Sequence, residues 1–262
     1  MHIFQPGRKE MKSSKFKRKY KALILDVDGT LVNGRYAVPS KKVTNAINKA
    51  RDSIHIGVAT SRPFFILAHI VSHLKLSGPS IVNAGANIID SSSGKVLWQR
   101  PVLKKDLRKM QAIASNLGCE LEFTSHKEYP GLNTYLKEDV LQAWCPNLEP
   151  RLADKLVNEI THIPTITTYK VKSWTDGKVD LVITHAQATK QHGILEVAKI
   201  LNISTNDIIG VGDGYNDFPL LMACGLKVAM GNAVPDLKAI ADYIAPTVDE
   251  DGVADVIERF VL

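Results

Sequence analysis

The sequence predicts an α/β protein, with a doubly wound, Rossmann-like parallel sheet core that is interrupted by an inserted α+β domain. Apolar runs without polar alternation, such as residues 22–25, are typical of strands buried on both faces of a parallel sheet. Strand and helix patterns alternate at both ends of the chain, as in a doubly wound sheet. Between these ends, about a hundred residues form hairpin and helix patterns instead, which suits a separate domain.

The first outer block begins with the buried strand pattern at 22–25. A helix is expected next, because Pro39 and Ser40 are typical of a helix start and an amphipathic pattern follows them. The rest of this block is expected to form a strand over 54–59, a helix over 63–76 and a strand over 80–83.

The middle block departs from this alternation. A serine-rich turn ending at Gly94 indicates a first hairpin, and Asp176-Gly177 indicates a second. The elements expected here are strands over 87–90 and 95–99, a helix over 103–117, a strand over 120–124, a helix over 150–161, and strands over 165–172 and 178–184. Residues 125–147 give no clear pattern.

The second outer block returns to alternation. It is expected to contain a helix over 190–201, a strand over 208–211, a helix ending at Leu220, a strand over 227–230, a helix over 236–241, a short strand and a final helix. We therefore predict a discontinuous core of residues 21–86 and 186–262, an insertion over 87–185 and an N-terminal tail over 1–20.

The formal net charge of +6 is located in that tail. Residues 1–20 hold seven Lys and Arg and one Glu, so the remaining chain is formally neutral. A short basic arm can touch phosphate or anionic lipid, but we expect a disordered extension and no specific nucleic-acid partner.

Cysteine usage and hydropathy indicate the cellular location of the protein. The three cysteines are far apart and lack Cys-x-x-Cys spacing, which argues against a disulfide framework or a zinc site. The most apolar stretch, 64–71, is too short to span a bilayer. We expect a soluble cytoplasmic protein without a membrane partner, either a monomer or a homodimer.

Polar residues gather at predicted carboxyl ends of core strands, where ligands bind in open α/β sheets. Asp26 and Asp28 follow the first strand and lie on the same side of it, with Val27 pointing away. An ordinary Asp-Gly turn is the alternative interpretation. Thr60 follows the second strand, where it is equally suited to cap a helix or to hold a phosphoryl oxygen.

Two further signatures occur in the second outer block. Lys190 precedes a helical pattern, a position at which lysine is usually a solvated surface charge. Asp213, Asn216 and Asp217 belong to a glycine-rich acidic loop directly after a strand. The glycines of this loop lack the spacing of a dinucleotide-binding motif.

Together these residues closely resemble the haloacid dehalogenase (HAD) superfamily of phosphatases, in particular the Cof-like subfamily IIB with a C2-type cap. The resemblance covers nearly the whole chain beyond residue 20. All four family motifs occur in order: DVDGT, the threonine Thr60, the lysine Lys190 and GDGYND. The stretch 83–86 resembles the segment that precedes this cap, with one alanine inserted. Ser61 and Gln191 stand where the family usually has glycine.

The resemblance implies a role for each motif residue. Asp26 would be the nucleophile that forms an aspartyl phosphate, and Asp28 the acid and then the base. Mg²⁺ would bind through Asp26, the Asp28 backbone carbonyl and Asp213, with Asp217 helping directly or through water. The residues expected to hold or orient the phosphoryl group are Thr60, Lys190, Asn216 and the backbone amide of Gly29.

The expected activity is Mg²⁺-dependent hydrolysis of a small phosphorylated metabolite, either a sugar phosphate or a phosphorylated carboxylic acid such as phosphoglycolate. The alternatives are a sugar phosphomutase or phosphotransferase of the same fold and a noncatalytic metabolite-binding module. His69 and His73 have a spacing compatible with zinc, but we expect an ordinary helix face. Trp98, Trp144 and Trp174 are expected to pack within the cap, although one could line its substrate-facing surface.

Overall fold

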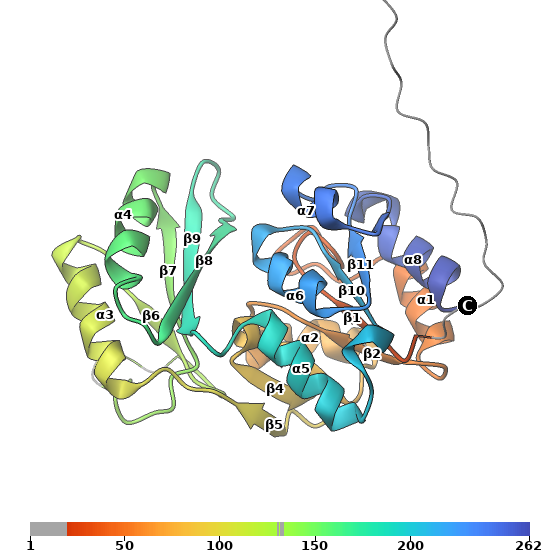
Figure 1. Ribbon diagram of the computed structural model, residues 1–262, viewed down its shortest axis with the longest axis horizontal. Coiled ribbons are helices and arrows are strands. Elements are labelled where there is room, and N and C mark those ends of the chain that lie inside the picture. Colours follow the sequence, from red (N-terminus) through yellow and green to blue (C-terminus); the bar gives the residue numbers. More distant parts are fainter. Residues whose placement is uncertain (1–19, 130, 132–133) are drawn as a thin grey trace, which may run out of the picture.

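The computed structural model describes residues 20–129, 131 and 134–262. Its core is a parallel sheet of five strands in the order β12-β11-β10-β1-β2 (Figure 1). These strands are β1 (Ala22–Leu25), β2 (His55–Val58), β10 (Ile208–Gly212), β11 (Leu226–Ala229) and β12 (Tyr243–Ile244). The predicted parallel core is therefore confirmed, and β1 lies at its centre. The expected tail falls almost wholly on residues 1–19, outside the described part of the chain.

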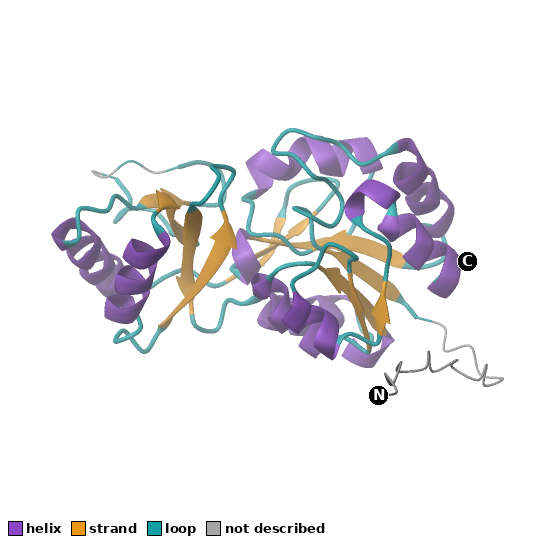
Figure 2. Ribbon diagram, turned by 90° about the horizontal axis from the view of Figure 1, so that it is seen from above, coloured by secondary structure: helices purple, strands orange, loops and turns teal. Residues whose placement is uncertain are grey.

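Helices cover both faces of the core sheet, as Figure 2 shows. Side chains of β1 alternate between the faces: Leu23 and Leu25 join one apolar cluster, whereas Ala22 and Ile24 join another. The first face is covered by α1 (Lys41–Ala50), α2 (Phe64–Leu74) and α8 (Gly252–Phe260). The second is covered by α5 (Lys190–Leu201), α6 (Phe218–Ala223) and α7 (Pro235–Ile240).

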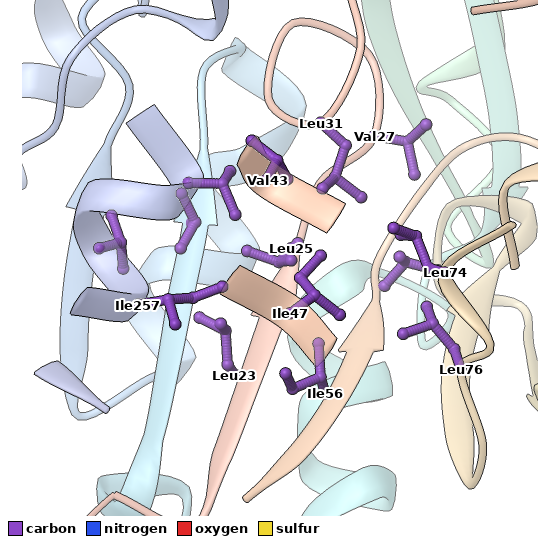
Figure 3. Packing of buried hydrophobic residues seen from close by; sticks show 14 of the residues in the cluster. Leu23, Leu25, Val27, Leu31, Val43, Ile47, Ile56, Leu74, Leu76 and Ile257 are labelled. Carbon is purple, nitrogen blue, oxygen red and sulfur yellow. The ribbon is translucent and has the colours of Figure 1, made fainter. Parts of the chain in front are cut away.

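Burial of the central strand explains its uninterrupted apolar sequence. Figure 3 shows Leu23 and Leu25 packed among Ile47 of α1, Ile56 of β2 and Ile257 of α8. Each of these five side chains is buried. Full burial of one such side chain contributes roughly 1.5–3 kcal/mol. The carboxyl end of β1 is thereby held firmly against both neighbouring strands.

A short antiparallel hairpin continues the core beyond β2. Strand β3 (Pro79–Val82) is joined to the end of β2 by a parallel bridge between Ala59 and Ile81. It pairs with β4 (Asn87–Asp90), which pairs with β5 (Val96–Gln99). The hairpin is formed as expected at the start of the expected 87–185 insertion, and it pairs with β3 in a three-stranded sheet beside the core sheet.

The cap is a four-stranded antiparallel sheet in the order β6-β7-β9-β8, with two helices on one face (Figure 1). The strands are β6 (Glu122–Thr124), β7 (Gln142–Leu148), β8 (Ile166–Lys172) and β9 (Val179–His185). The helices are α3 (Lys104–Asn116) and α4 (Pro150–Ile160). Strand β7 was not predicted, because Pro146 and Asn147 interrupt its apolar pattern. In the structure a register shift follows Cys145.

None of the helices in the described ranges has the length and apolar character required to cross a bilayer.

Candidate active site

Three adjacent parallel strands bring the predicted site residues to one edge of the core. Strand β1 lies between β2 and β10, and all three run in the same direction. Asp26 follows β1, Thr60 follows β2 after one residue, and Asp213 follows β10. The Asp26 amide donates to Val211 O at 2.9 Å and the Thr60 amide to Ile81 O at 3.0 Å. Backbone hydrogen bonds between neighbouring strands thus fix the positions of the Asp26 and Thr60 backbones, from which the side chains extend.

Lys190 is the buried centre of the site and is not a solvated surface charge. Its side chain is 2 % exposed, and its Nζ donates to Asp26 Oδ1 at 2.6 Å and to Asp217 Oδ1 at 2.5 Å. It is the first residue of α5, and the preceding Thr189 caps that helix. Gly85 has a φ of +114° and lies so close that a Cβ there would collide with the Thr189 carbonyl. The loop 83–86 therefore packs directly against the backbone at the start of α5, which carries Lys190.

Asp217 holds the acidic loop in place. Its Oδ2 accepts the backbone amides of Asp213 and Gly214, each at 2.9 Å, and its Oδ1 accepts Lys190. Both carboxylate oxygens are therefore already engaged by this chain. The geometry gives Asp217 the task of positioning the loop and the lysine, which fits a supporting role toward a metal better than a direct one.

The crowded carboxylates shift the ionisation of the site. Burial, followed by the nearby Asp217, raises the pKa of Asp26 well above its ordinary value, and Lys190 opposes this effect. Burial and Asp217 likewise raise the pKa of Asp213 to about 7. Burial alone would lower the pKa of Lys190, but Asp217 and Asp26 outweigh it and hold that pKa above its ordinary value. Among the described residues the site thus brings together more carboxylates than its buried lysine can neutralise, which is why ionising them all is unfavourable in the absence of another cation.

The residues present fit a hard divalent cation. Asp26, Asp213 and Asp217 each offer an oxygen, and these oxygens lie within 4.8 Å of one another. Carboxylate and carbonyl oxygens are the ligands that Mg²⁺ takes in proteins. Gly29 keeps this space open, because its φ is +84° and a Cβ there would collide with the Asp213 carboxylate. Asn232 secures the same region by donating to Gly29 O at 2.8 Å.

Asp28 is held by an arginine whose role the sequence analysis did not identify. Arg62 Nε donates to Asp28 Oδ2 at 3.0 Å, and Nη2 donates to Asp28 Oδ1. The same guanidinium donates through Nη1 to Arg35 O at 2.9 Å. Such a forked pair fixes the orientation of the carboxylate as well as its charge. The signal for it was the position of Arg62 two residues beyond Thr60.

A cavity of about 220 Å³ extends from the site toward the cap. Asp26, Asp28, Thr60, Asp213 and Asn216 line its core side. The cap-side lining includes Thr124, Gln142, Trp144, Trp174 and Asp180. Lys190, Asp217 and Gly29 are not part of this lining, but they contact the lining residues Asp26 and Asp213. The structure thus brings all eight predicted site residues to one region. On the cap side it adds Thr124, Gln142 and Asp180, which sequence patterns did not reveal, and places both Trp144 and Trp174 on the cavity, where one tryptophan was considered.

The remaining candidates have other surroundings. His73 Nε2 lies 3.1 Å from Thr44 Oγ1, whereas His69 Nδ1 lies 3.0 Å from Ile66 O, so the two rings serve different local contacts. Trp98 lies on β5 and packs against the core, contrary to the expectation that all three tryptophans pack within the cap.

The two departures from glycine do not strain the backbone. Ser61 and Gln191 are absent from the described residues with positive φ, so neither adopts a conformation that favours glycine. In the inserted loop, by contrast, Asn83 and Ala84 have φ values of 51° and 57°.

Comparison with known proteins identifies the family. The model of the haloacid dehalogenase-like hydrolases matches residues 23–147 and 147–257, so this chain belongs to that family. Its structural neighbours include subclass IIB phosphatases of the superfamily. The family assignment makes this chain a phosphatase-type hydrolase, as predicted.

Individual relatives share less than 30 % sequence identity with this chain in the comparisons that follow. The chain is 27 % identical to a 5-amino-6-(5-phospho-D-ribitylamino)uracil phosphatase of Bacillus subtilis, over 92 % of this chain and 96 % of that protein. It is 28 % identical to a phosphoglycolate phosphatase of Methanopyrus kandleri, over 91 % and 96 % respectively. The phosphatase BT1666 of Bacteroides thetaiotaomicron has a TM-score of 0.81 at 22 % identity, over 94 % and 97 %. The subclass IIB sugar phosphatase BT4131 has a TM-score of 0.76 at 24 % identity, over 92 % and 98 %.

Proposed function

We propose that this protein is a Mg²⁺-dependent phosphatase that hydrolyses a small phosphorylated metabolite through an aspartyl-phosphate intermediate. The observation that carries the proposal is the buried Lys190 between Asp26 and Asp217, with Asp26 and the nearby Asp213 lining a cavity. The substrate is a sugar phosphate or a phosphorylated carboxylic acid such as phosphoglycolate. Two relatives support this range of substrates, a 5-amino-6-(5-phospho-D-ribitylamino)uracil phosphatase and a phosphoglycolate phosphatase.

Asp26 is the proposed nucleophile. Lys190 holds one carboxylate oxygen at 2.6 Å and so fixes the plane in which the other oxygen meets phosphorus. Attack forms the bond between the Asp26 oxygen and phosphorus, and the ester bond to the leaving oxygen breaks. Asp28, oriented by Arg62, gives a proton to that oxygen and then takes one from the water that cleaves the intermediate.

Thr60 and Asn216 are proposed to bind the nonbridging oxygens of the phosphoryl group together with Lys190. The Gly29 amide was expected to join them, but it already donates to Val32 O at 2.8 Å and is therefore not free to do so. Donors fixed before the reaction stabilise developing charge without reorganisation. Mg²⁺ held by Asp26, Asp213 and the Asp28 carbonyl, with Asp217 in support through water, would supply neutralising charge between these carboxylates and the phosphate. The raised pKa values of Asp26 and Asp213 support such a cation.

The cap is proposed to close over the substrate and to exclude water. Phe65 of α2 meets Tyr129 of the cap edge to face, with ring centroids 5.0 Å apart. Gln99 ends the hairpin that pairs with β3, the strand bridged to the end of β2, so we place the functional boundary of the cap after it. The three cysteines are free and buried, in keeping with the cytoplasmic location we propose.

Phosphate release tests this proposal. We expect the wild-type protein to release phosphate from members of a panel of sugar phosphates, phosphoglycolate and an aryl phosphate, and to stop when Mg²⁺ is chelated. Asp26→Asn is expected to abolish release while leaving the circular dichroism spectrum unchanged. A rearranged sugar phosphate in place of free phosphate would indicate a mutase, and full activity of Asp26→Asn would refute the assignment.

A further inference from the structure

The inner face of the cap sheet forms the wall of the cavity that faces the core site. Side chains alternate along β7: Ala143 and Cys145 pack toward α3 and α4, whereas Gln142 and Trp144 line the cavity. The paired strand β9 repeats this arrangement, with Asp180 and Val182 on the cavity side. A wall of the cavity is therefore built from every second residue of two paired strands.

Asp180 is an unusual member of this wall because it is charged and buried. It is only 5 % exposed, and its Oδ1 accepts the Asn147 backbone amide at 2.9 Å. Asn147 has a φ of 55° and belongs to the register shift in β7, so the irregularity of that strand turns an amide toward the carboxylate. Among the described residues, no Lys or Arg lies within ion-pair distance of Asp180, and its second oxygen has no hydrogen-bond partner.

Gln142 offers a second unsatisfied group on the same wall. It is 4 % exposed, and its Oε1 is buried without a hydrogen-bond partner among the described residues. Neighbouring Thr124 is already engaged, since its Oγ1 accepts Asn83 Nδ2 at 3.0 Å and donates to Gln142 O at 3.3 Å. A buried acceptor left without a donor costs about 1–3 kcal/mol, so such groups usually have a partner in the working state.

The charges around the cavity restrict what that partner can be. A leaving group with a second negative charge would meet the Asp180 carboxylate in a place where water screens little. Lys172 and Arg35 also line the cavity and oppose a leaving group with a positive charge. Both are exposed, so water screens the attraction that they would exert on a carboxylate more than it screens the repulsion by the buried Asp180. Neutral hydroxyl groups satisfy both acceptors, and the adjacent Trp144 and Trp174 offer apolar faces to the carbon chain that bears them.

We propose that Asp180 is a specificity-determining residue, which with Gln142 selects a neutral leaving group rich in hydroxyls and rejects one that carries a carboxylate. This inference rests on the proposed phosphatase function and chooses between the two substrate classes named there. Asp180 acts on the leaving group alone and takes no part in the transfer of the phosphoryl group.

Binding to an inactive protein tests this directly. In an Asp26→Asn background, isothermal titration calorimetry gives dissociation constants for sorbitol 6-phosphate and 2-phosphoglycolate in the presence of Mg²⁺. We expect tighter binding of sorbitol 6-phosphate, and we expect the added Asp180→Asn change to shrink this preference at least about tenfold, the effect of losing a hydrogen bond to a charged group. Asparagine retains an oxygen for the Asn147 amide, which preserves the local fold.

Two further variants complete the experiment. Asp176→Asn, in the exposed turn between β8 and β9, removes the same charge and is expected to leave the preference unchanged. Gln142→Met is expected to weaken sorbitol 6-phosphate binding without improving 2-phosphoglycolate binding, because it removes an acceptor but no charge.

The inference is overturned if 2-phosphoglycolate binds more tightly, if sorbitol 6-phosphate does not bind, or if Asp180→Asn leaves the preference as it was. Failure of the proposed function is read separately, as the absence of phosphate release by the wild-type protein from every ester tested.

Discussion

Replacement of Lys190 by methionine tests the electrostatic centre of the site. The lysine is 2 % exposed, and its two partners Asp26 and Asp217 have side chains that are 5 % and 0 % exposed. Methionine fills a similar volume but leaves both carboxylates unpaired. Removal of one partner from a buried ion pair costs about 3–5 kcal/mol. For 262 residues this corresponds to a fall in melting temperature of roughly 5–9 °C.

The assay is urea unfolding of Lys190→Met followed by circular dichroism, without metal and then with Mg²⁺. The free energy of unfolding is expected to fall by about 3–5 kcal/mol without metal, and added Mg²⁺ is expected to restore part of it. Lys199→Met on the same helix is the matched control. Lys199 is 70 % exposed and, among the described residues, forms an ion pair with Glu196 alone, so we expect a loss of at most about 1 kcal/mol.

The dependence on pH has a definite sign. Lys190 lowers the pKa of Asp26, so its removal raises that pKa further above the unfolded value. A carboxylate with a raised folded pKa is destabilising when ionised, and this destabilisation disappears as the pH falls toward the unfolded value of about 4. The deficit of Lys190→Met is thus larger at pH 8 than at pH 5. A deficit equal to that of Lys199→Met, or one independent of pH, would refute the reasoning.

The other predictions concern the acid, the glycine and the metal. In Arg62→Lys the lysine cannot form the forked pair with Asp28, so kcat for an alkyl phosphate is expected to fall at least about tenfold. The fall in kcat for an aryl phosphate is expected to be smaller, because its leaving group needs little protonation. Equal losses for the two substrates would argue against an acid at Asp28. Gly29→Ala forces a Cβ onto Asp213 at a φ of +84°, so we expect urea unfolding to show a loss of about 1–3 kcal/mol and calorimetry to show weaker Mg²⁺ binding; unchanged values would contradict this. The pKa of Asp213 without metal is about 7, so a proton competes with Mg²⁺ for this carboxylate below that pH. The dissociation constant of Mg²⁺ is therefore expected to be larger at pH 6 than at pH 8. The same dissociation constant at both pH values would refute the competition.

The core site could be predicted because its signals are local. Each polar residue directly follows a buried strand, and parallel strands place their carboxyl ends at one edge, so Asp26, Thr60 and Asp213 had to lie near one another. The burial of Lys190 did not follow from such a pattern. It depends on the Asp26 and Asp217 carboxylates, which lie 164 and 27 residues away along the chain.

The cap side of the site could not be predicted for a different reason. Gln142 and Asp180 meet the same cavity only through the register of an antiparallel pair, and the strand that carries Gln142 was missed because Pro146 breaks its pattern. Sheet membership is also a tertiary property. The hairpin formed by 87–90 and 95–99 was expected in the insertion, and in the structure it pairs with β3, the strand that directly precedes it.

Stoichiometric phosphorylation of Asp26 is the most direct test of the central claim. An aryl phosphate needs no acid for its leaving group, so Asp28→Asn is expected to accept the phosphoryl group on Asp26 but to hydrolyse it slowly. Rapid mixing of Asp28→Asn with p-nitrophenyl phosphate and Mg²⁺ is therefore expected to release a burst of about one nitrophenolate per protein, followed by slow turnover. The Asp26→Asn variant is expected to give no burst. A burst of equal size from Asp26→Asn would contradict the account, since the phosphoryl group would then be carried by another residue.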